Sequence, residues 1–294
     1  MTNANVSIGN TASAWTGSNG AFTVQIDQPG TYPVTIEAPG FHTSNSEIEI
    51  KTQSAFTNLF RKVLPADTNY FDLNFYDHVF RTNGTTGTKR WTTTPAVEIW
   101  TKKMKCLVAL GNLCLQYEVT ATPTPIHFES LTRAVVNIDF PQLTGNVISG
   151  VNITTKSHPT GTILNFASEL TSHTIYVANM TRGSTSFGGA AYAGTASTGG
   201  NVAGQITGSE IHLNSYFQAD KVGTYRHELA HALGWNHPSV AAGSLTEYDS
   251  MPRRSVMERP GIISSWDKSH GAILYTRPAG SASPDTDPTG SSVQ

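Results

Sequence analysis

Apolar and polar residues alternate along the first fifty residues of the chain. The segments "AFTVQI", "YPVTIEA" and "SEIEIKT" place apolar side chains at every second position, which is the period of a β-strand with one buried face. The intervening segments "DQPGT" and "APGFHTSN" are rich in residues that favour turns. The pattern predicts a small all-β unit over residues 1–53.

The rest of the chain mixes the periods of strands and helices. Strands are predicted in "PAVEIW", "GVNITT", "TIYVANM" and "SEIHLNS". Leu131, Val135 and Ile138 recur at helical spacing, and Gly145 follows as a stop signal. Another helix is expected to begin near Lys221. The mixture predicts an α+β fold.

Three further regions complete the predicted domain organisation. Residues 54–90 are an aromatic-rich segment, which we interpret as a linker that packs against the larger domain. That larger domain is expected to span residues 91–276. The tail, residues 277–294, has no apolar periodicity and is predicted to be disordered.

The composition narrows the classes of function. Charged residues make up only 14% of the 294 residues and the net charge is -2, so the basic footprint of a nucleic-acid-binding protein is missing. The sequence has no apolar run of the length that a membrane-spanning helix requires. An uncharged polar surface is typical of extracellular proteins, which predicts a secreted or cell-surface location, although "MTNANVSIGN" does not have the pattern of a signal peptide.

Cys106 and Cys114 are the two cysteines of the chain, in "CLVALGNLC". Their spacing fits no zinc motif. Two interpretations stay open at this point: a small-loop disulfide if the protein is exported, or two unpaired buried thiols.

The stretch "YRHELAHALGWNHP" holds three of the ten histidines. His227 and His231 are four residues apart, so on a helix both point from one face and can bind one zinc ion. His237 would lie about 15 Å further along the axis if the helix continued. Gly234 stands where a glycine can end a helix with positive φ, so the chain can turn and return His237 to the metal.

Glu228 lies beside His227 and suits the role of a general base. Three protein ligands leave one position of a tetrahedral zinc for water, which is the arrangement of a catalytic site. Glu228 would take a proton from that water and pass it to a leaving amine. The plainer alternative is an amphipathic core helix whose histidines are satisfied by hydrogen bonds.

The segment "HELAHALGWNH" resembles the HExxHxxGxxH zinc signature of the metzincin metallopeptidases. The resemblance implies a mixed twisted sheet, an active-site helix and a small C-terminal part. It also implies that Met257, in "RRSVMERPG", forms the Met-turn, a hydrophobic base under the zinc rather than a ligand. The segment "SSWDKSHGAILYTRP" resembles the closing helix of matrixin-like bacterial members, with Ile273, Leu274 and Tyr275 facing inward.

Other features of the family are less well matched. Some metzincins have a tyrosine two residues after the Met-turn methionine, where this chain has Arg259, so the ligands are expected to be three histidines and water. A structural calcium ion is left open, but no EF-hand loop or RTX repeat supports one. The aspartates of "SPDTDP" are interpreted as part of a solvated tail. The edge strand that binds substrate is expected near "GGAAYAG", for which a plain loop is an equal alternative.

Roughly forty residues within the predicted unit 1–53 give it a resemblance to the carboxypeptidase-regulatory-like β-sandwich, an accessory module of secreted bacterial proteins. "TGSNGAFTVQIDQPGTYPVTIEAPGFHT" carries this resemblance, although the strand that usually precedes "ANVSI" is missing, which indicates an incomplete N-terminus.

The sequence as a whole predicts a monomeric, secreted zinc endopeptidase that acts on protein or peptide substrates. Its expected metal ligands are His227, His231 and His237, its base is Glu228, and one zinc ion is its cofactor. Two alternatives remain: a catalytically silent protein whose β-sandwich is a binding module, and a zinc hydrolase that acts on something other than protein.

Overall fold

The fold is known from a computed structural model of the chain. It describes residues 1–51, 63–66, 71–81, 86–110, 113–165, 173–181, 194–200, 203–214, 221–238, 255–257 and 262–288. Strands and helices both contribute to it, so the coarse α+β class predicted from the sequence is correct. Within this described part, no helix is long and apolar enough to cross a membrane.

The N-terminal unit is an antiparallel sheet with its own small core. Its strands, in the order β2-β1-β3-β4, are β1 (Asn5–Ile8), β2 (Ala12–Trp15), β3 (Gly30–Glu37) and β4 (Ser44–Ile50). Val6, Val34 and Ile48 are among its buried residues. The predicted strand "AFTVQI" is not part of this sheet. Instead, Phe22 and Val24 pack against the apolar face, so the segment acts as a second layer.

A larger mixed sheet forms the second unit. Parallel pairing joins β8 to β5, β5 to β10 and β10 to β12, and β11 adds an antiparallel strand at the edge. A long hairpin, β6 and β7, continues from β10 and pairs with β9. The bounds are β5 (Ala96–Trp100), β6 (Lys102–Leu110), β7 (Leu113–Pro123), β8 (Ile153–Lys156), β9 (Ile163–Asn165), β10 (Thr174–Met180), β11 (Gly194–Gly200) and β12 (Ile206–Asn214).

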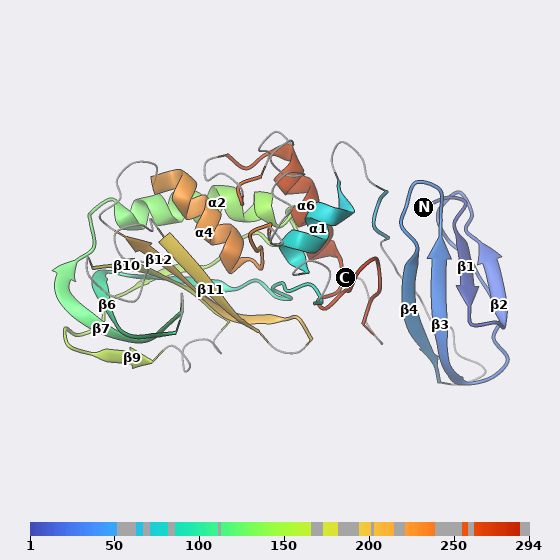
Figure 1. The fold of residues 1–294 in the computed structure, drawn as a ribbon, viewed down its shortest axis with the longest axis horizontal. Coiled ribbons are helices and arrows are strands. Elements are labelled where there is room, and N and C mark those ends of the chain that lie inside the picture. The colour runs from blue at the N-terminus through green and yellow to red at the C-terminus, as the bar shows by residue number, and fades with distance from the viewer. Residues whose placement is uncertain are drawn as a thin grey trace, which may run out of the picture.

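Successive side chains of a strand point to opposite faces of the large sheet, and both faces are apolar. On β10, Ile175 and Val177 belong to the main core, whereas Tyr176, Ala178 and Met180 belong to a second core beneath the hairpin. The helices lie on the main-core side of the sheet (Figure 1). They are α1 (Leu73–Phe80), α2 (Phe128–Leu143), α4 (Lys221–Ala232) and α6 (Ser265–Thr276).

Helix α1 changes the interpretation of residues 54–90, which we expected to be a linker. Phe75, Tyr76, Val79 and Phe80 are buried in the main core together with residues of α4 and α6. The described part of this segment is therefore an integral layer of the larger unit, because its aromatic side chains supply core volume. Residues 52–62, 67–70 and 82–85 lie outside the described residues.

The predicted disorder of residues 277–294 is wrong for the part that the structure describes. Residues 277–288, here called the C-terminal segment, are packed, and residues 289–294 lie outside the described residues. Asp285 and Asp287 are buried, so they are not solvated as we expected.

Buried charges explain why a segment without apolar periodicity packs at all. Arg277 pairs with Asp285 and, at 2.6 Å, with Asp287. Asn45 of β4 forms two backbone hydrogen bonds with the segment, which lies between the two units (Figure 1). Ion pairing and backbone pairing leave no trace in hydrophobic periodicity, which is why the sequence pattern missed this segment.

The two cysteines are joined. Cys106 of β6 and Cys114 of β7 form a disulfide near the turn of the hairpin. Of the two interpretations left open by the sequence, the disulfide is the correct one.

Candidate metal centre

Two of the three histidines lie one helical turn apart on α4, which begins at Lys221 as predicted. The ring centroids of His227 and His231 are 4.8 Å apart. Leu229 and Ala230 lie on the buried side of the same helix. Burial of this side fixes the rotation of α4, so both imidazoles point to one place.

The third histidine is brought back by a sharp reversal after α4. Gly234 has φ +95°, and a Cβ atom there would lie 2.3 Å from the carbonyl oxygen of Lys89. Only glycine fits this backbone conformation and this close approach. The reversal returns His237, whose ring centroid lies 4.9 Å from that of His227 and 4.6 Å from that of His231.

Backbone carbonyl groups fix the tautomers of all three rings. In each histidine the Nδ1 atom faces a carbonyl oxygen, which can only accept a hydrogen bond. The pairs are His227 with Val256 at 2.7 Å, His231 with Trp235 at 2.7 Å and His237 with Met257 at 3.3 Å. Each Nδ1 therefore carries a hydrogen, and in the neutral ring Nε2 is the nitrogen with the free lone pair.

These lone pairs fit a metal ion. The Nε2 atoms of His231 and His237 are 3.2 Å apart, and the ligand atoms of all three histidines lie within 4.8 Å of one another. In a tetrahedral zinc site, two nitrogen atoms at the usual zinc–nitrogen distance lie about 3.3 Å from each other. Two imidazole lone pairs at this separation repel each other unless a cation lies between them. Three nitrogen donors are a ligand set that suits zinc.

Burial favours the neutral form of two of the histidines, and it also changes the pKa of Glu228. Burial lowers the pKa of His231 to about 3 and also lowers the pKa of His227. Neutral imidazole is the form that binds metal. Burial also raises the pKa of Glu228, which is 6% exposed, to about 8. A carboxyl group of this kind can exchange a proton near neutral pH.

A second group of hydrogen bonds holds the turn that supplies two of the carbonyls. Asp267 of α6 accepts a hydrogen bond from the hydroxyl of Ser255 at 2.7 Å and from the backbone N–H of Val256 at 3.2 Å. The Ser255 hydroxyl oxygen in turn accepts from the N–H of Met257 at 3.1 Å. The first turn of α6 therefore fixes the residues that orient His227 and His237.

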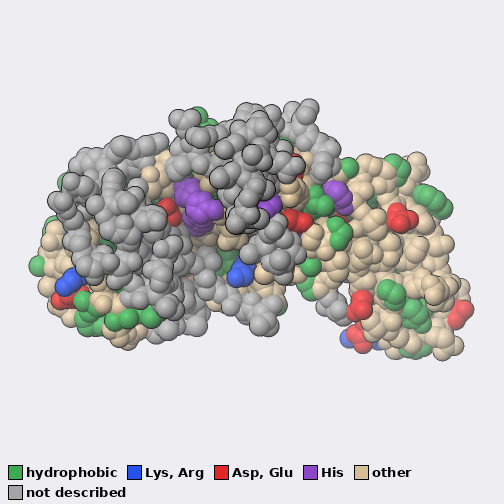
Figure 2. All heavy atoms as spheres, viewed as in Figure 1, with side chains coloured by type: hydrophobic (Ala, Val, Ile, Leu, Met, Phe, Trp, Pro, Cys, Tyr) green, Lys and Arg blue, Asp and Glu red, His purple; other side chains and the backbone are tan. Residues whose placement is uncertain are grey.

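Exposure increases across the site. His227 is buried, His231 is partly buried and His237 is exposed. Figure 2 shows the largest group of histidine side chains on this face in its left half, with smaller groups further to the right. The edge strand β11 runs beside α4 and contacts it (Figure 1). His237 is thus the member of the three that solvent reaches most readily.

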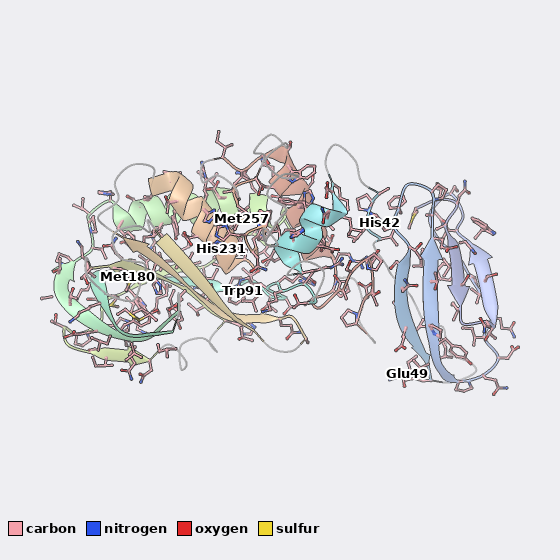
Figure 3. The ribbon with its side chains drawn as sticks, in the orientation of Figure 1. His42, Glu49, Trp91, Met180, His231 and Met257 are labelled. Carbon is pink, nitrogen blue, oxygen red and sulfur yellow. A yellow bond between two sulfur atoms is a disulfide. The ribbon has the colours of Figure 1, made fainter. Side chains whose placement is uncertain are left out.

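The structure brings together the three histidines that the sequence singled out, with Glu228 next to His227. Met257 is buried and is labelled close to His231 in Figure 3. Arg259 and most of "GGAAYAG" lie outside the described residues. Sequence reasoning missed Asp267 and the carbonyl groups that fix the tautomers. Only the helix-capping pattern of Ser264 and Asp267 could have drawn attention to the first of these.

Comparison of the chain with models of known protein families, with curated proteins and with solved structures finds no match. The chemistry assigned to the site therefore rests on its residues and their geometry.

Proposed function

We propose that the protein is a zinc-dependent endopeptidase of the metzincin type. The observation that carries this proposal is the convergence of three imidazole Nε2 atoms, with a buried carboxyl group beside the first of them. The spacing HExxHxxGxxH and the glycine reversal are those of the metzincin signature. The Met-turn role of Met257 and the metzincin arrangement of the large sheet are parts of the same proposal.

The residues of the site have separate roles in the proposed hydrolysis. Zinc, when bound, supplies a Lewis acid that activates water and polarises the carbonyl group of the substrate. His227, His231 and His237 would hold the ion. Glu228 accepts the proton of the attacking water and delivers it to the leaving amine, for which its raised pKa is suited.

The substrate is proposed to be an extended peptide that pairs with β11. This strand bonds to β12 on one side and forms the edge of the large sheet among the described strands. An exposed edge can accept one more strand, which gives affinity through backbone hydrogen bonds. Because β11 contacts α4, a peptide bound along it would pass close to the histidines.

A secreted or cell-surface location is part of the proposal. The disulfide between Cys106 and Cys114 supports it, because structural disulfides persist in oxidising compartments.

The experiment that tests this function separates metal binding from catalysis. Glu228→Gln keeps the size of the side chain but removes the base, so we expect one zinc per chain and a loss of peptidase activity of about 10²–10⁴-fold. Zinc content is measured by elemental analysis, and activity by cleavage of an unfolded protein substrate with and without chelator. Glu129→Gln, on α2 and paired with Arg133, is the matched control and should keep wild-type activity.

Two results would contradict the proposal. Full activity in Glu228→Gln would show that this residue is not the base. A wild-type chain that binds zinc but cleaves no protein would favour the alternatives: a binding module with a silent site, or hydrolysis of another substrate class.

A further inference from the structure

Helix α1 contacts the loop that carries the third histidine. The carbonyl oxygen of Val79 accepts a hydrogen bond from the N–H of Asn236 at 2.8 Å. The ring of Phe80 packs edge-on against Trp235, with centroids 4.8 Å apart. Trp235 and Asn236 directly precede His237 in the chain, so α1 supports the return of the chain from Gly234.

Contact with α1 therefore affects two ligands at once. The carbonyl group of Trp235 orients His231 through its Nδ1 atom, and Asn236 leads into His237. His237 is the exposed member of the three and lies outside the helix. Of the three ligands, it depends most on its loop being held.

One buried arginine anchors the end of α1. Arg81 is 0% exposed, and its guanidinium group donates to Asp77 at 2.9 Å, to the carbonyl oxygen of Ser281 at 3.1 Å and to that of Pro284 at 3.0 Å. It also lies over the ring of Tyr76 at 4.9 Å. The end of α1 is thereby joined to the C-terminal segment, and the two lie next to each other in Figure 1.

The C-terminal segment continues this connection to the N-terminal sheet. Asn45 of β4 donates to the carbonyl oxygen of Asp285 at 2.7 Å and accepts from the N–H of Asp287 at 3.0 Å. The Asp285 carboxylate also accepts from the N–H of Leu64 at 3.0 Å. Direct contacts thus run from β4, through the C-terminal segment and Arg81, to α1 and the ligand loop.

We propose that α1, anchored by Arg81 and the C-terminal segment, is a positioning element for the metal ligand His237. A ligand on a loop binds metal tightly only if the loop is already held in the binding conformation, because ordering it during binding costs free energy. The hydrogen bond to Val79 and the contact with the Phe80 ring hold the His237 loop in place before metal binds. The inference rests on the metal site of the proposed function, but not on peptidase activity.

The competing explanation is that α1 only stabilises the larger unit as a whole. In that case, a substitution elsewhere in the larger unit that lowers the unfolding free energy by the same amount would weaken metal binding to the same extent. Met104→Ala provides this comparison, because Met104 is fully buried in the second core, on the other side of the large sheet from the helices. The two explanations predict different results for this control.

The test compares metal affinity in Phe80→Ala, Arg81→Gln and Met104→Ala, with Phe80→Leu as the milder variant if Phe80→Ala does not fold. Zinc affinity is measured by competition with a chelator, and the site geometry by the visible absorption of Co²⁺ bound in its place. Loss of groups that orient metal ligands typically costs 10–100-fold in affinity. We expect about a tenfold loss of zinc affinity and an altered Co²⁺ spectrum in the α1 variants, and neither in Met104→Ala.

Hydrogen exchange in the metal-free protein gives an independent measure. The amide of Asn236 should exchange faster in Arg81→Gln than in the wild type, because its partner Val79 is less firmly held. Wild-type affinity, spectrum and exchange in the α1 variants would overturn the inference. So would an equal loss of affinity in Met104→Ala. A wild-type chain that binds zinc but has no peptidase activity would contradict the proposed function alone.

Discussion

Gly234 combines two constraints that no other residue of the site shares. Its φ of +95° lies in the left-handed region, and a Cβ atom would come within 2.3 Å of the Lys89 carbonyl oxygen. The first constraint is conformational and the second is steric. A matched glycine separates them. Gly150 has φ +67°, and a Cβ atom added there would meet no heavy atom within 4 Å apart from those of Gly150 and its two neighbours in the chain.

Gly234→Ala should therefore cost more than Gly150→Ala. The positive φ alone costs about 1 kcal/mol, as expected for Gly150→Ala, whereas the additional overlap should bring Gly234→Ala to about 3 kcal/mol. We also expect zinc affinity to fall at least tenfold in Gly234→Ala alone. Urea unfolding and chelator competition measure the two effects. Equal stabilities of the two variants would show that the contact with Lys89 relaxes freely.

His270 provides a pH dependence that is separate from the metal ligands. Burial lowers its pKa from the ordinary 6.5 to about 4, because the ring is enclosed by Phe71, Phe75 and Trp266. The folded state thus binds the proton less readily than the unfolded state. The stability associated with neutral His270 is complete above pH 6.5 and declines as the pH falls toward 4, by about 3 kcal/mol at 1.36 kcal/mol per unit.

His270→Phe should remove this part of the pH dependence while keeping an aromatic ring. The variant loses the hydrogen bond to Trp266 at every pH, so its absolute stability is lower throughout. The measurement is the difference in unfolding free energy between wild type and variant from pH 7 to pH 4. We expect this difference to shrink as the pH falls, and a constant difference would refute the assignment.

At the scale of elements, the first turn of α6 serves two purposes. Ser264 and Asp267 form a reciprocal capping box that begins the helix. Asp267 also binds Ser255 and Val256, which belong to the turn that orients His227 and His237. Its carboxylate is therefore shared between a helix cap and the metal site.

The two purposes can be separated by substitution. Ser264→Ala removes the cap and should cost about 1 kcal/mol while zinc affinity stays at the wild-type value. Asp267→Ala also leaves the buried Ser255–Met257 turn without its acceptor, and we expect a loss of about 3 kcal/mol together with a tenfold lower zinc affinity. Thermal unfolding and chelator competition test both. Equal zinc affinity in the two variants would show that the turn holds its shape unaided.

The elements that could be predicted from the sequence are those with strong periodicity or a motif. Helix α2 and the strands β5, β8, β10 and β12 occur where hydrophobic spacing indicated them. Helix α4 occurs where the histidine segment indicated a helix, and α6 where the family resemblance implied one. Helix α1 was missed because its aromatic residues are buried on most sides, which hides the period of 3.6. The C-terminal segment was missed because buried ion pairs such as that of Arg277 hold it. The convergence of the three histidines could be predicted because their spacing is local, whereas Asp267 reaches the site only through tertiary structure.

On the scale of the whole molecule, the described residues form separate hydrophobic cores. The core of the N-terminal sheet shares no residue with the main core around α4. Backbone hydrogen bonds of Asn45 with the C-terminal segment are among the contacts that join the two units. Metal binding should thus stabilise one unit far more than the other.

Removal of zinc provides the test. A ligand present at a thousandfold excess over its Kd stabilises the folded state by about 4 kcal/mol. For a unit of this size, chelation should lower the melting temperature of the larger unit by roughly 10 °C and leave the transition of the N-terminal sheet unchanged. Differential scanning calorimetry with and without chelator measures this. Equal shifts of both transitions, or a single shared transition, would contradict the separation of the cores.

The position of the C-terminal segment also has a consequence for biosynthesis. Asn45, Leu64 and Arg81, which it contacts, are all translated before it, and so are the three histidines. Domains of a growing chain begin to fold from the N-terminal side while the rest is still being made. The last anchor of α1 is therefore synthesised only after the loop that carries His237. The order of translation itself delays completion of the metal centre until synthesis has reached the C-terminal segment.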